Sequence, residues 1–508
     1  MSVGSFIRLI HASWVLAREG VFTDVDPLGL PPSARLPLAL AKRLVRRGAK
    51  HNRNRLAKAM EKLGPSYIKL GQFLATRPDI VGPRAAEELS ELQDRLSPFP
   101  QSKAVEIIET DLGAPINEIF AEFGAPVAAA SIAQVHKARV SDAKGSREVA
   151  VKVLRPGVER RFRRDVEDML RAAKFAERYS AEARRLRMVD VVDTLARSVR
   201  LEMDFRIEAA AASEFAENTD LDPMFRVPEV EWDLTSKNVL VTEWIYGTSL
   251  SDLDRLRRLD VDLPALARNV VQSFLRHAMR DGFFHADMHQ GNLFVDAEGR
   301  LVAVDFGITG RLGEKERRFL AEILYGFITR DYRRVAEVHF EAGYVPRIHA
   351  VEDFAQAIRA IGEPIHSRTA DQISMAKLLA LLFEVTALFD MRTRTELVLL
   401  QKTMVVVEGV ARSLDPRLDL WSTAEPVVGE WVRRNLGPAA TVTDMKQVAA
   451  ALRKLLPALP GLIENSLNRT DREPREGDVV APPRIAQRGV VLALWFIAGL
   501  LALNIALR

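Results

Sequence analysis

A polar stretch from His285 to Asn292, followed by the tripeptide Asp305-Phe306-Gly307, constrains this 508-residue chain more than any other feature. Asn292 stands five positions after Asp287, and Asp305 ends an apolar run typical of a buried strand. Transfer of a phosphoryl group from a nucleotide needs a carboxylate at the acceptor, with an Asn and an Asp that hold the bridging metal ions. The sequence therefore predicts that Asp287 is the catalytic residue, as a base or a water-positioning group, and that Asn292 and Asp305 bind Mg2+.

The order and spacing of these residues are those of the catalytic loop and the magnesium-binding Asp of protein kinases. We therefore expect an α+β, protein-kinase-like fold with two lobes. One alternative is a polar loop in which His285 and His289 bond only to backbone groups. Another is a metal hydrolase with His285, Asp287 and His289 as ligands, but it would leave Asn292 and Asp305 without a role.

A lysine inside an apolar strand supports the kinase interpretation. Lys152 lies within the run from Ala150 to Val153, and a buried ammonium group without a partner is too costly to be tolerated. In the kinase signature, the lysine at this place grips the α- and β-phosphates of ATP and pairs with a helical Glu. Glu202 and Glu208 stand six positions apart on a predicted helix and so face different directions. We expect Glu208 to pair with Lys152.

Two further segments are expected to contact the nucleotide. The first is a strand, a tight turn and a strand, in which small residues let backbone amides approach phosphate oxygens. It comprises Val127, Ala128, Ala129, Ala130, Ser131, Ile132, Ala133, Gln134 and Val135. Alanines stand where glycines are usual, so this turn should be stiff, and taken alone the pattern favours a packed hairpin. The second segment is the strand containing Glu243, where a kinase hinge would offer backbone groups to adenine.

Composition and charge exclude several other classes of protein. The chain has no cysteine, so it has neither a disulfide framework nor a thiolate metal site. A net charge of +4 implies no global attraction to polyanions, and no nucleic-acid partner is expected. The stretch 35–58 carries nine Lys or Arg and no acidic residue, which fits either a membrane-surface helix or a solvated helix face. No G-x-G-x-x-G follows a strand, which disfavours a flavin-dependent hydroxylase.

The last part of the sequence predicts a membrane anchor. The nineteen residues 489–507 carry no charge, and such a stretch can cross ~30 Å of hydrocarbon as a helix. Arg484 and Arg488 precede it, so we expect a single-pass protein of the inner (cytoplasmic) membrane with its soluble part in the cytoplasm. The alternative is a buried core helix. The N-terminus does not resemble a cleavable signal peptide, because His11 and Arg18 interrupt its apolar residues.

Five units are expected along the chain. Residues 1–120 form a helical extension, and 121–247 a kinase-like N-lobe with an insert. A helical C-lobe follows at 248–467, with the catalytic loop and the Asp-Phe-Gly. A polar linker at 468–488 leads to the transmembrane helix at 489–507.

With these residues in hand, the chain resembles the UbiB family of atypical kinases. The resemblance rests on Lys69 to Gln72 for K-x-G-Q, Ala128 to Ser131 for an Ala-rich loop, Glu202 to Asp204 for E-x-D, and His285 to Asn292 for H-x-D-x-H-x-x-N. It implies regulatory roles for Lys69, Gln72, Glu202 and Asp204, with Lys69 engaging both acids over the active site. Met288 and Gln290 depart from the family, which often has Pro at both places, and Ala211 stands where Asn is frequent.

The resemblance also implies an activity and partners. It suggests a membrane-anchored atypical kinase or ATPase, a phosphotransferase-type enzyme that uses ATP and Mg2+ and supports ubiquinone (coenzyme Q) biosynthesis. The implied partners are membrane lipids, isoprenoid quinone precursors and ubiquinone biosynthesis proteins, with a possible homodimer. Lys69 and the Ala-rich segment would crowd the acceptor side, which favours slow ATP hydrolysis or a small acceptor over a protein substrate. The alternative is a nucleotide-gated lipid-binding or lipid-extraction module without a phosphoacceptor.

Overall fold

The structure is a computed structural model, and its described residues cover most of the chain up to residue 436. They are 3–23, 32–46, 54–75, 77–90, 92, 97–142, 145–179, 181–259, 261–365, 381, 384–385, 388–391 and 395–436. The predicted linker at 468–488 lies outside these ranges.

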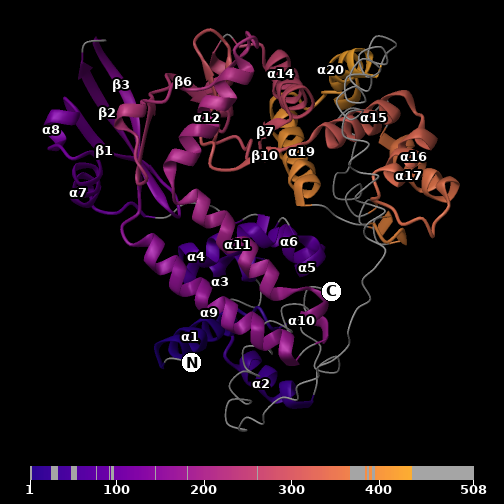
Figure 1. Cartoon of the computed structure of the whole chain (residues 1–508), viewed down its shortest axis with the longest axis horizontal. Coiled ribbons are helices and arrows are strands. Elements are labelled where there is room, and N and C mark those ends of the chain that lie inside the picture. Colours follow the sequence, from indigo (N-terminus) through magenta and orange to yellow (C-terminus); the bar gives the residue numbers. More distant parts are fainter. Residues whose placement is uncertain are drawn as a thin grey trace, which may run out of the picture.

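Helices from two separate parts of the chain form one layer beneath the rest of the molecule (Figure 1). The first set is α1 (Val3–Arg18), α2 (Pro32–Arg43), α3 (Arg55–Leu63), α4 (Pro65–Ala75), α5 (Pro78–Val81) and α6 (Pro83–Ser90). The second set is α9 (Val158–Tyr179), α10 (Ala181–Arg185) and α11 (Met188–Glu202). Leu56, Met60 and Leu74 from the first set pack with Val191 of α11, which joins the two sets around one apolar core.

The N-lobe is a four-stranded antiparallel sheet in the order β1-β2-β3-β5. Its strands are β1 (Glu122–Ala129), β2 (Ala133–Asp142), β3 (Gly145–Leu154) and β5 (Val239–Glu243). Val149, Val151 and Val153 are fully buried, in a cluster shared with α7 (Gln101–Leu112) and the short α8 (Ile116–Ile119). Because side chains alternate along a strand, Lys152 must face the opposite side of the sheet. That side meets α12 (Phe205–Thr219).

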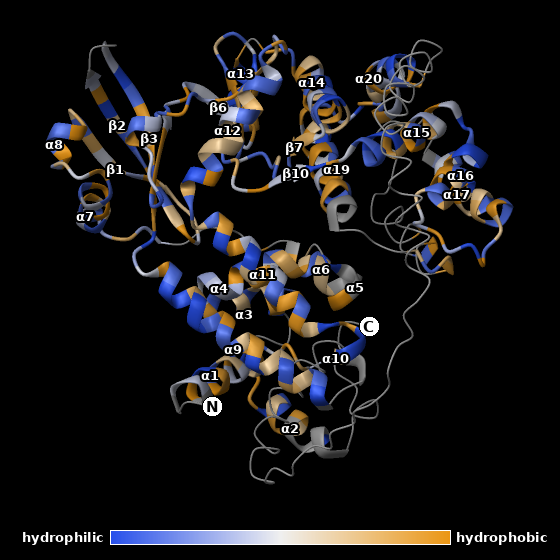
Figure 2. Ribbon diagram, viewed as in Figure 1, coloured by the Kyte–Doolittle hydropathy of each residue, from blue (hydrophilic) through white to orange (hydrophobic). Residues whose placement is uncertain are grey.

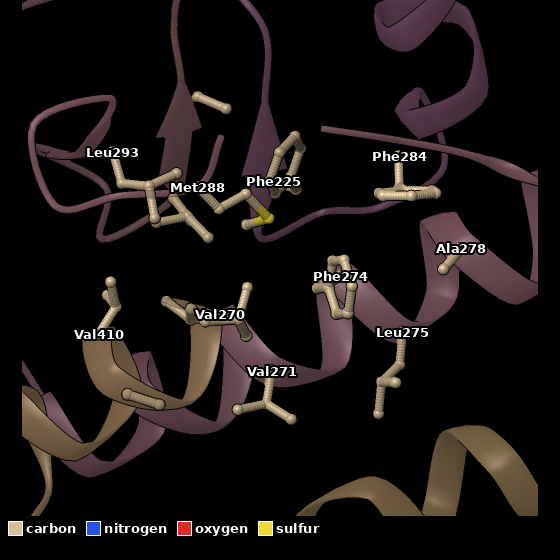
Figure 3. Packing of buried hydrophobic residues seen from close by; sticks show 14 of the residues in the cluster. Phe225, Val270, Val271, Phe274, Leu275, Ala278, Phe284, Met288, Leu293 and Val410 are labelled. Carbon is tan, nitrogen blue, oxygen red and sulfur yellow. The ribbon is translucent and has the colours of Figure 1, made fainter. Parts of the chain in front are cut away.

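The C-lobe is built around α14 (Leu263–Arg276), whose apolar face meets short strands on one side and α19 (Thr395–Leu414) and α20 (Leu420–Asn435) on another. Figure 3 shows Val270 and Phe274 of α14 beneath Phe225, Met288 and Leu293. The strands are β4 (Phe225–Arg226), β6 (Gly247–Ser249), β7 (Phe283–His285), β8 (Leu293–Asp296), β9 (Leu301–Ala303) and β10 (Thr309–Arg311). Four of them form a sheet in the order β4-β9-β8-β6, and the other two form the pair β10-β7. The predicted catalytic loop runs from the end of β7 to the start of β8 and so connects the pair to the sheet.

Smaller elements complete the two lobes, and three helices extend the second. The smaller elements are the 3-10 turn η3 (Trp232–Leu234) before β5, and α13 (Leu253–Arg258) and the π-helical turn η4 (His277–Asp281) on either side of α14. The extension is α15 (Glu314–Thr329), α16 (Tyr332–Glu341) and α17 (Val351–Ile365), with its own core around Tyr332 and Phe354. Glu322 of α15 is bound by Arg334 of α16 and by Arg318, which ties the first two helices together.

The kinase-like α+β architecture agrees with the prediction, but the transmembrane part of that prediction must be corrected. Within the described ranges, no helix is both long enough and apolar enough to span a bilayer. The 22-residue α9, for example, carries charged side chains along its length, as the blue bands in Figure 2 show. The stretch expected to form the anchor, 489–507, lies outside the described residues. We therefore withdraw the single-pass, inner-membrane assignment.

Candidate nucleotide and phosphoryl-transfer site

Both ring nitrogens of His285 form hydrogen bonds that fix the start of the predicted catalytic loop. This side chain ends β7 and is 1% exposed. Its Nε2 donates to the Val304 carbonyl at 3.1 Å, and its Nδ1 accepts from the Asp287 N–H at 3.0 Å. Burial lowers the pKa of His285, which keeps the imidazole neutral as this arrangement requires. With both nitrogens engaged, His285 cannot be a ligand in the alternative metal hydrolase.

Asn292 braces the other side of Asp287. The Asn292 amide donates to the Asp287 carbonyl at 3.1 Å and lies 3.4 Å from Asp287 Oδ2. The Asn292 carbonyl in turn accepts from the Val304 N–H at 2.9 Å, immediately before Asp305. These bonds bring the predicted catalytic residue and both predicted metal ligands to one end of the short strands β8 and β9.

Lys152 lies between the carboxylates of Glu208 and Asp305, and the sequence predicts the pair with Glu208. Its Nζ is 2.8 Å from Glu208 Oε1 and 3.1 Å from Asp305 Oδ1. Burial alone would lower the pKa of Lys152, but the Asp305 and Glu208 carboxylates raise it, so the group stays an ammonium. Burial raises the pKa of Glu208 to about 7 against the opposing charge of Lys152. Burial would also raise the pKa of Asp305, but Lys152 holds it well below its usual range.

This arrangement fits a magnesium ion bound together with phosphates. The pKa of Asp305 is held low, so its carboxylate stays ionised and offers a divalent cation a negatively charged ligand. Carboxylate and amide oxygens are ligands that Mg2+ accepts, usually with phosphates completing its shell. Asp305 has a φ of 63°, a left-handed conformation that is costly outside glycine and concentrates at functional sites. Asp305 and Asn292 are therefore the residues that would hold the ion.

The nine residues predicted to cover the phosphates divide into two groups. Val127 and Ala128 are exposed at the end of β1, and Ala129, Ala130 and Val135 are half-buried. Ile132 and Ala133 instead pack into the apolar cluster with α9 and α12, and Ser131 is buried. The turn closes through a bond from the Ala130 N–H to the Ala133 carbonyl at 2.8 Å.

Gln134 is placed by the structure away from the nucleotide side. Its Oε1 accepts from the Phe99 N–H at 2.9 Å, and its Nε2 lies 2.9 Å from His136 Nε2. His136 Nδ1 then donates to the Gly124 carbonyl at 2.9 Å. This buried chain of polar groups ties β1 and β2 to the segment before α7. The signal was present in the sequence, because Gln134 and His136 are in phase with the buried Ala138 and Val140.

Glu243 in the predicted hinge is already engaged by the protein. Arg226 of β4 contacts its carboxylate at 2.5 and 2.6 Å, and the Glu243 N–H donates to the Glu229 carbonyl at 2.8 Å. The next N–H, from Trp244, donates to the Glu148 carbonyl at 3.1 Å. A contact from Glu243 to adenine would therefore use its carbonyl oxygen, not its side chain.

Comparison with known proteins agrees with this geometry. The ABC1 atypical kinase-like domain matches residues 91–339, and the UbiB helical domain matches residues 358–419. A "Probable protein kinase UbiB" from Marinobacter nauticus is 40% identical over 466 residues, covering 91% of this chain and 85% of that protein. The chain belongs to the UbiB family. A "Probable protein kinase UbiB" from Aliivibrio fischeri is also 40% identical, over 82% of this chain and 77% of its own length.

One solved structure similar to this UbiB-family chain is the complex of Rv3197 with erythromycin from Mycobacterium tuberculosis. It is 25% identical and covers 71% of this chain and 90% of its own, with a TM-score of 0.49. A similarity at this TM-score carries no information about the ligand of the present site.

The K-x-G-Q segment of this UbiB-family chain lies on α4, and its lysine pairs with only one of the two acids expected. Lys69 Nζ is 2.7 Å from Glu202 Oε2, and both side chains are largely buried. Asp204 instead caps α12, where it accepts from the Arg206 N–H at 3.2 Å and pairs with the Arg206 guanidinium at 2.6 Å. That hydrogen bond lowers the pKa of Asp204. Gln72 is half-buried on the same helix.

The structure adds Phe215 of α12, a residue that sequence reasoning missed. Phe306 lies between His285 and Phe215, with ring centroids 5.0 and 5.1 Å away. Phe215 is on α12, the helix that carries Glu208, so an aromatic contact connects that helix to the catalytic loop and the Asp-Phe-Gly. A lone Phe on a helix gives no such signal, because the same pattern fits any core residue.

Proposed function

We propose that this UbiB-family chain binds ATP with Mg2+ and transfers the γ-phosphoryl group to a small hydroxyl acceptor or to water. The observation that carries this proposal is the position of Lys152 between Glu208 and Asp305, beside Asp287 and Asn292. An ammonium, a metal-binding carboxylate and an acceptor-side carboxylate are the parts that phosphoryl transfer requires.

The chain's own residues would act as follows. Lys152 would bind the phosphate oxygens, and Asn292 and Asp305 would hold the ion, which supplies charge neutralisation when bound. The acceptor oxygen would attack the γ-phosphorus as the bond to the β–γ bridging oxygen breaks, and ADP would leave with that bond's electron pair. The proton of the acceptor would pass to Asp287 and then to solvent.

A small acceptor suits the surroundings of this site better than a protein does. Lys69 and Glu202 form a largely buried pair, and Lys69 is close enough to help lower the pKa of Asp305. A segment this near the carboxylate limits the space in which a peptide could dock. We propose a phenolic or isoprenoid quinone precursor, or water, as the acceptor, and a role in ubiquinone biosynthesis alongside the other proteins of that pathway.

The test is nucleotide binding and turnover by the full chain. Wild type should bind Mg-ATP and release ADP, and Asp305→Asn should lose metal-dependent binding and at least 100-fold in turnover, as expected when a metal-borne electrostatic contribution is removed. Glu298→Gln, at a carboxylate that is 64% exposed in the same lobe, is the matched control. Asp305→Asn with wild-type binding and turnover would refute the assignment.

A second candidate is an ATP-gated module that binds a lipid without phosphorylating it. It is favoured by the exposed side chains of Ile7, Ile10 and Trp14, which lie along one face of α1. The two functions differ in where the γ-phosphate goes. Transfer of label from γ-labelled ATP onto a purified phenolic quinone precursor would count against the second candidate, whereas release as inorganic phosphate alone would leave it in place.

A further inference from the structure

His289 belongs to the catalytic loop, yet the roles assigned so far do not use it. Its side chain is 52% exposed, and its Nδ1 accepts a hydrogen bond from the Gly291 N–H at 3.0 Å. A ring nitrogen that accepts cannot itself carry hydrogen, so a neutral imidazole in this place must carry its hydrogen on Nε2. The Gly291 N–H therefore leaves Nε2 as the ring nitrogen that can donate.

The hydrogen-bearing nitrogen of His289 faces Asp287. Nε2 lies 3.7 Å from Asp287 Oδ2, so a small rotation of either side chain would bring them within hydrogen-bond distance. The Asn292 amide approaches the same oxygen at 3.4 Å. His289 Nε2 and the Asn292 amide therefore both lie on the Oδ2 side of the Asp287 carboxylate. Asp287 Oδ1 has no hydrogen-bond partner among the described residues and is left to face an acceptor.

The lack of a side chain at Gly291 also supports this position of the His289 ring. A Cβ atom at residue 291 would lie 2.9 Å from His289 Cε1 and 3.0 Å from His289 Nδ1. Contacts this short would push the imidazole off the loop. The glycine is therefore what allows the ring of His289 to lie against the backbone and reach Asp287.

We propose that His289 is a positioning residue that orients the Asp287 carboxylate through its Nε2–H, and that Gly291 holds the ring there. The inference rests on the proposed function, because it assumes that Asp287 takes the acceptor's proton. The imidazole acts as a hydrogen-bond donor to Asp287 and not as a ligand of the γ-phosphate. With both donors on the Oδ2 side, the proton of the acceptor goes to Oδ1.

The test compares three substitutions of His289 in the full chain. His289→Ala should lower kcat about 10- to 100-fold, the usual loss when a partner that orients a functional group is removed, with KM for ATP unchanged. His289→Gln keeps an uncharged N–H donor at the place of Nε2 and should recover most of that loss. His289→Lys supplies a cation without the fixed donor and should not. Recovery by Lys but not by Gln would overturn the proposal.

Two further variants separate this role from a general effect on folding. Gly291→Ala should reproduce the kinetic loss of His289→Ala, with unchanged Mg-ATP affinity and melting temperature. His349→Ala is the matched control, because His349 also pairs with an Asp, at 3.2 Å from Asp390, but outside the site. Wild-type turnover in His289→Ala would overturn this inference alone. Failure of the wild-type chain to bind Mg-ATP would instead refute the proposed function.

Discussion

Replacing Asp222 by Asn should strongly destabilise the C-lobe. Asp222 is 5% exposed and sits in the segment between α12 and β4. Its oxygens accept from Arg280 at 2.7 and 3.0 Å, and His277 Nε2 lies 3.3 Å away. In the variant, one acceptor oxygen becomes an NH2 donor that faces a guanidinium. The segment that follows α12 would then lose its anchor on η4.

The magnitude follows from these contacts. Two charge-assisted hydrogen bonds contribute about 1.5–3 kcal/mol each, and we reduce their sum because the Arg280 side chain is 36% exposed to solvent. We expect a loss of about 2–4 kcal/mol in the free energy of unfolding, or roughly 4–16 °C in melting temperature at about 2–4 °C per kcal/mol for a lobe of about 150–250 residues. Urea unfolding followed by circular dichroism would measure it.

The pH dependence gives a second check on the same residue. Burial alone would raise the pKa of Asp222, but hydrogen bonds from His277 and Arg280 hold it well below its usual range. A depressed pKa in the folded state stabilises the fold above the unfolded pKa of about 4 and loses that contribution as pH falls further. The difference between wild type and Asp222→Asn should therefore shrink below about pH 4.

Asp254→Asn is the control for Asp222→Asn, since Asp254 also pairs with an Arg, at 3.3 Å, but is 82% exposed. Breaking an exposed pair should change the free energy of unfolding by less than about 0.5 kcal/mol. Equal effects of the two substitutions would refute the argument that burial makes the Asp222 cluster costly to break.

Three other outcomes are expected. Lys152→Met should raise the pKa of Asp305 and weaken Mg-ATP binding in titration calorimetry, because Lys152 is the main charge that lowers that pKa. Burial lowers the pKa of His136, so wild type should lose stability as pH falls below about 6.5, and a His136→Gln variant should lose less in thermal melts. Gly310→Ala should lower the free energy of unfolding, measured in urea, by about 1–3 kcal/mol, because its Cβ would lie 2.2 Å from Phe284 Cζ. Gly409→Ala is the control: nothing lies within 4 Å of the added Cβ, so the change should be neutral or stabilising.

Much of the site could be predicted because phosphoryl transfer dictates residue types at fixed spacings. The positions of Asp287, Asn292 and Asp305 follow from a loop between short strands, and a buried Lys152 had to find a carboxylate. The ion pair with Glu208 was expected on that ground, although 56 residues separate the two. Local geometry and the cost of burying charge were therefore enough to predict these residues from the sequence.

Other parts of the site depended on tertiary packing that no local pattern records. The alternation in β2 assigns Gln134 to the same face as Ala138 and Val140, but only the pairing of β2 with its neighbours determines which of the two faces meets the core. Asp204 is taken by Arg206 because the helix begins immediately after it.

Glu202 and Glu208 stand on either side of a short turn, between the end of α11 and the first turn of α12. Glu202 is bound to Lys69 and Glu208 to Lys152, so the turn between α11 and α12 connects the two ion pairs. Under the proposed function, a molecule that separates Lys69 from Glu202 by moving the start of α12 would also change how Lys152 holds ATP. By thermodynamic reciprocity, ATP would then alter the affinity for that molecule by the same factor. Measuring either affinity with and without the other ligand therefore reports the same coupling energy.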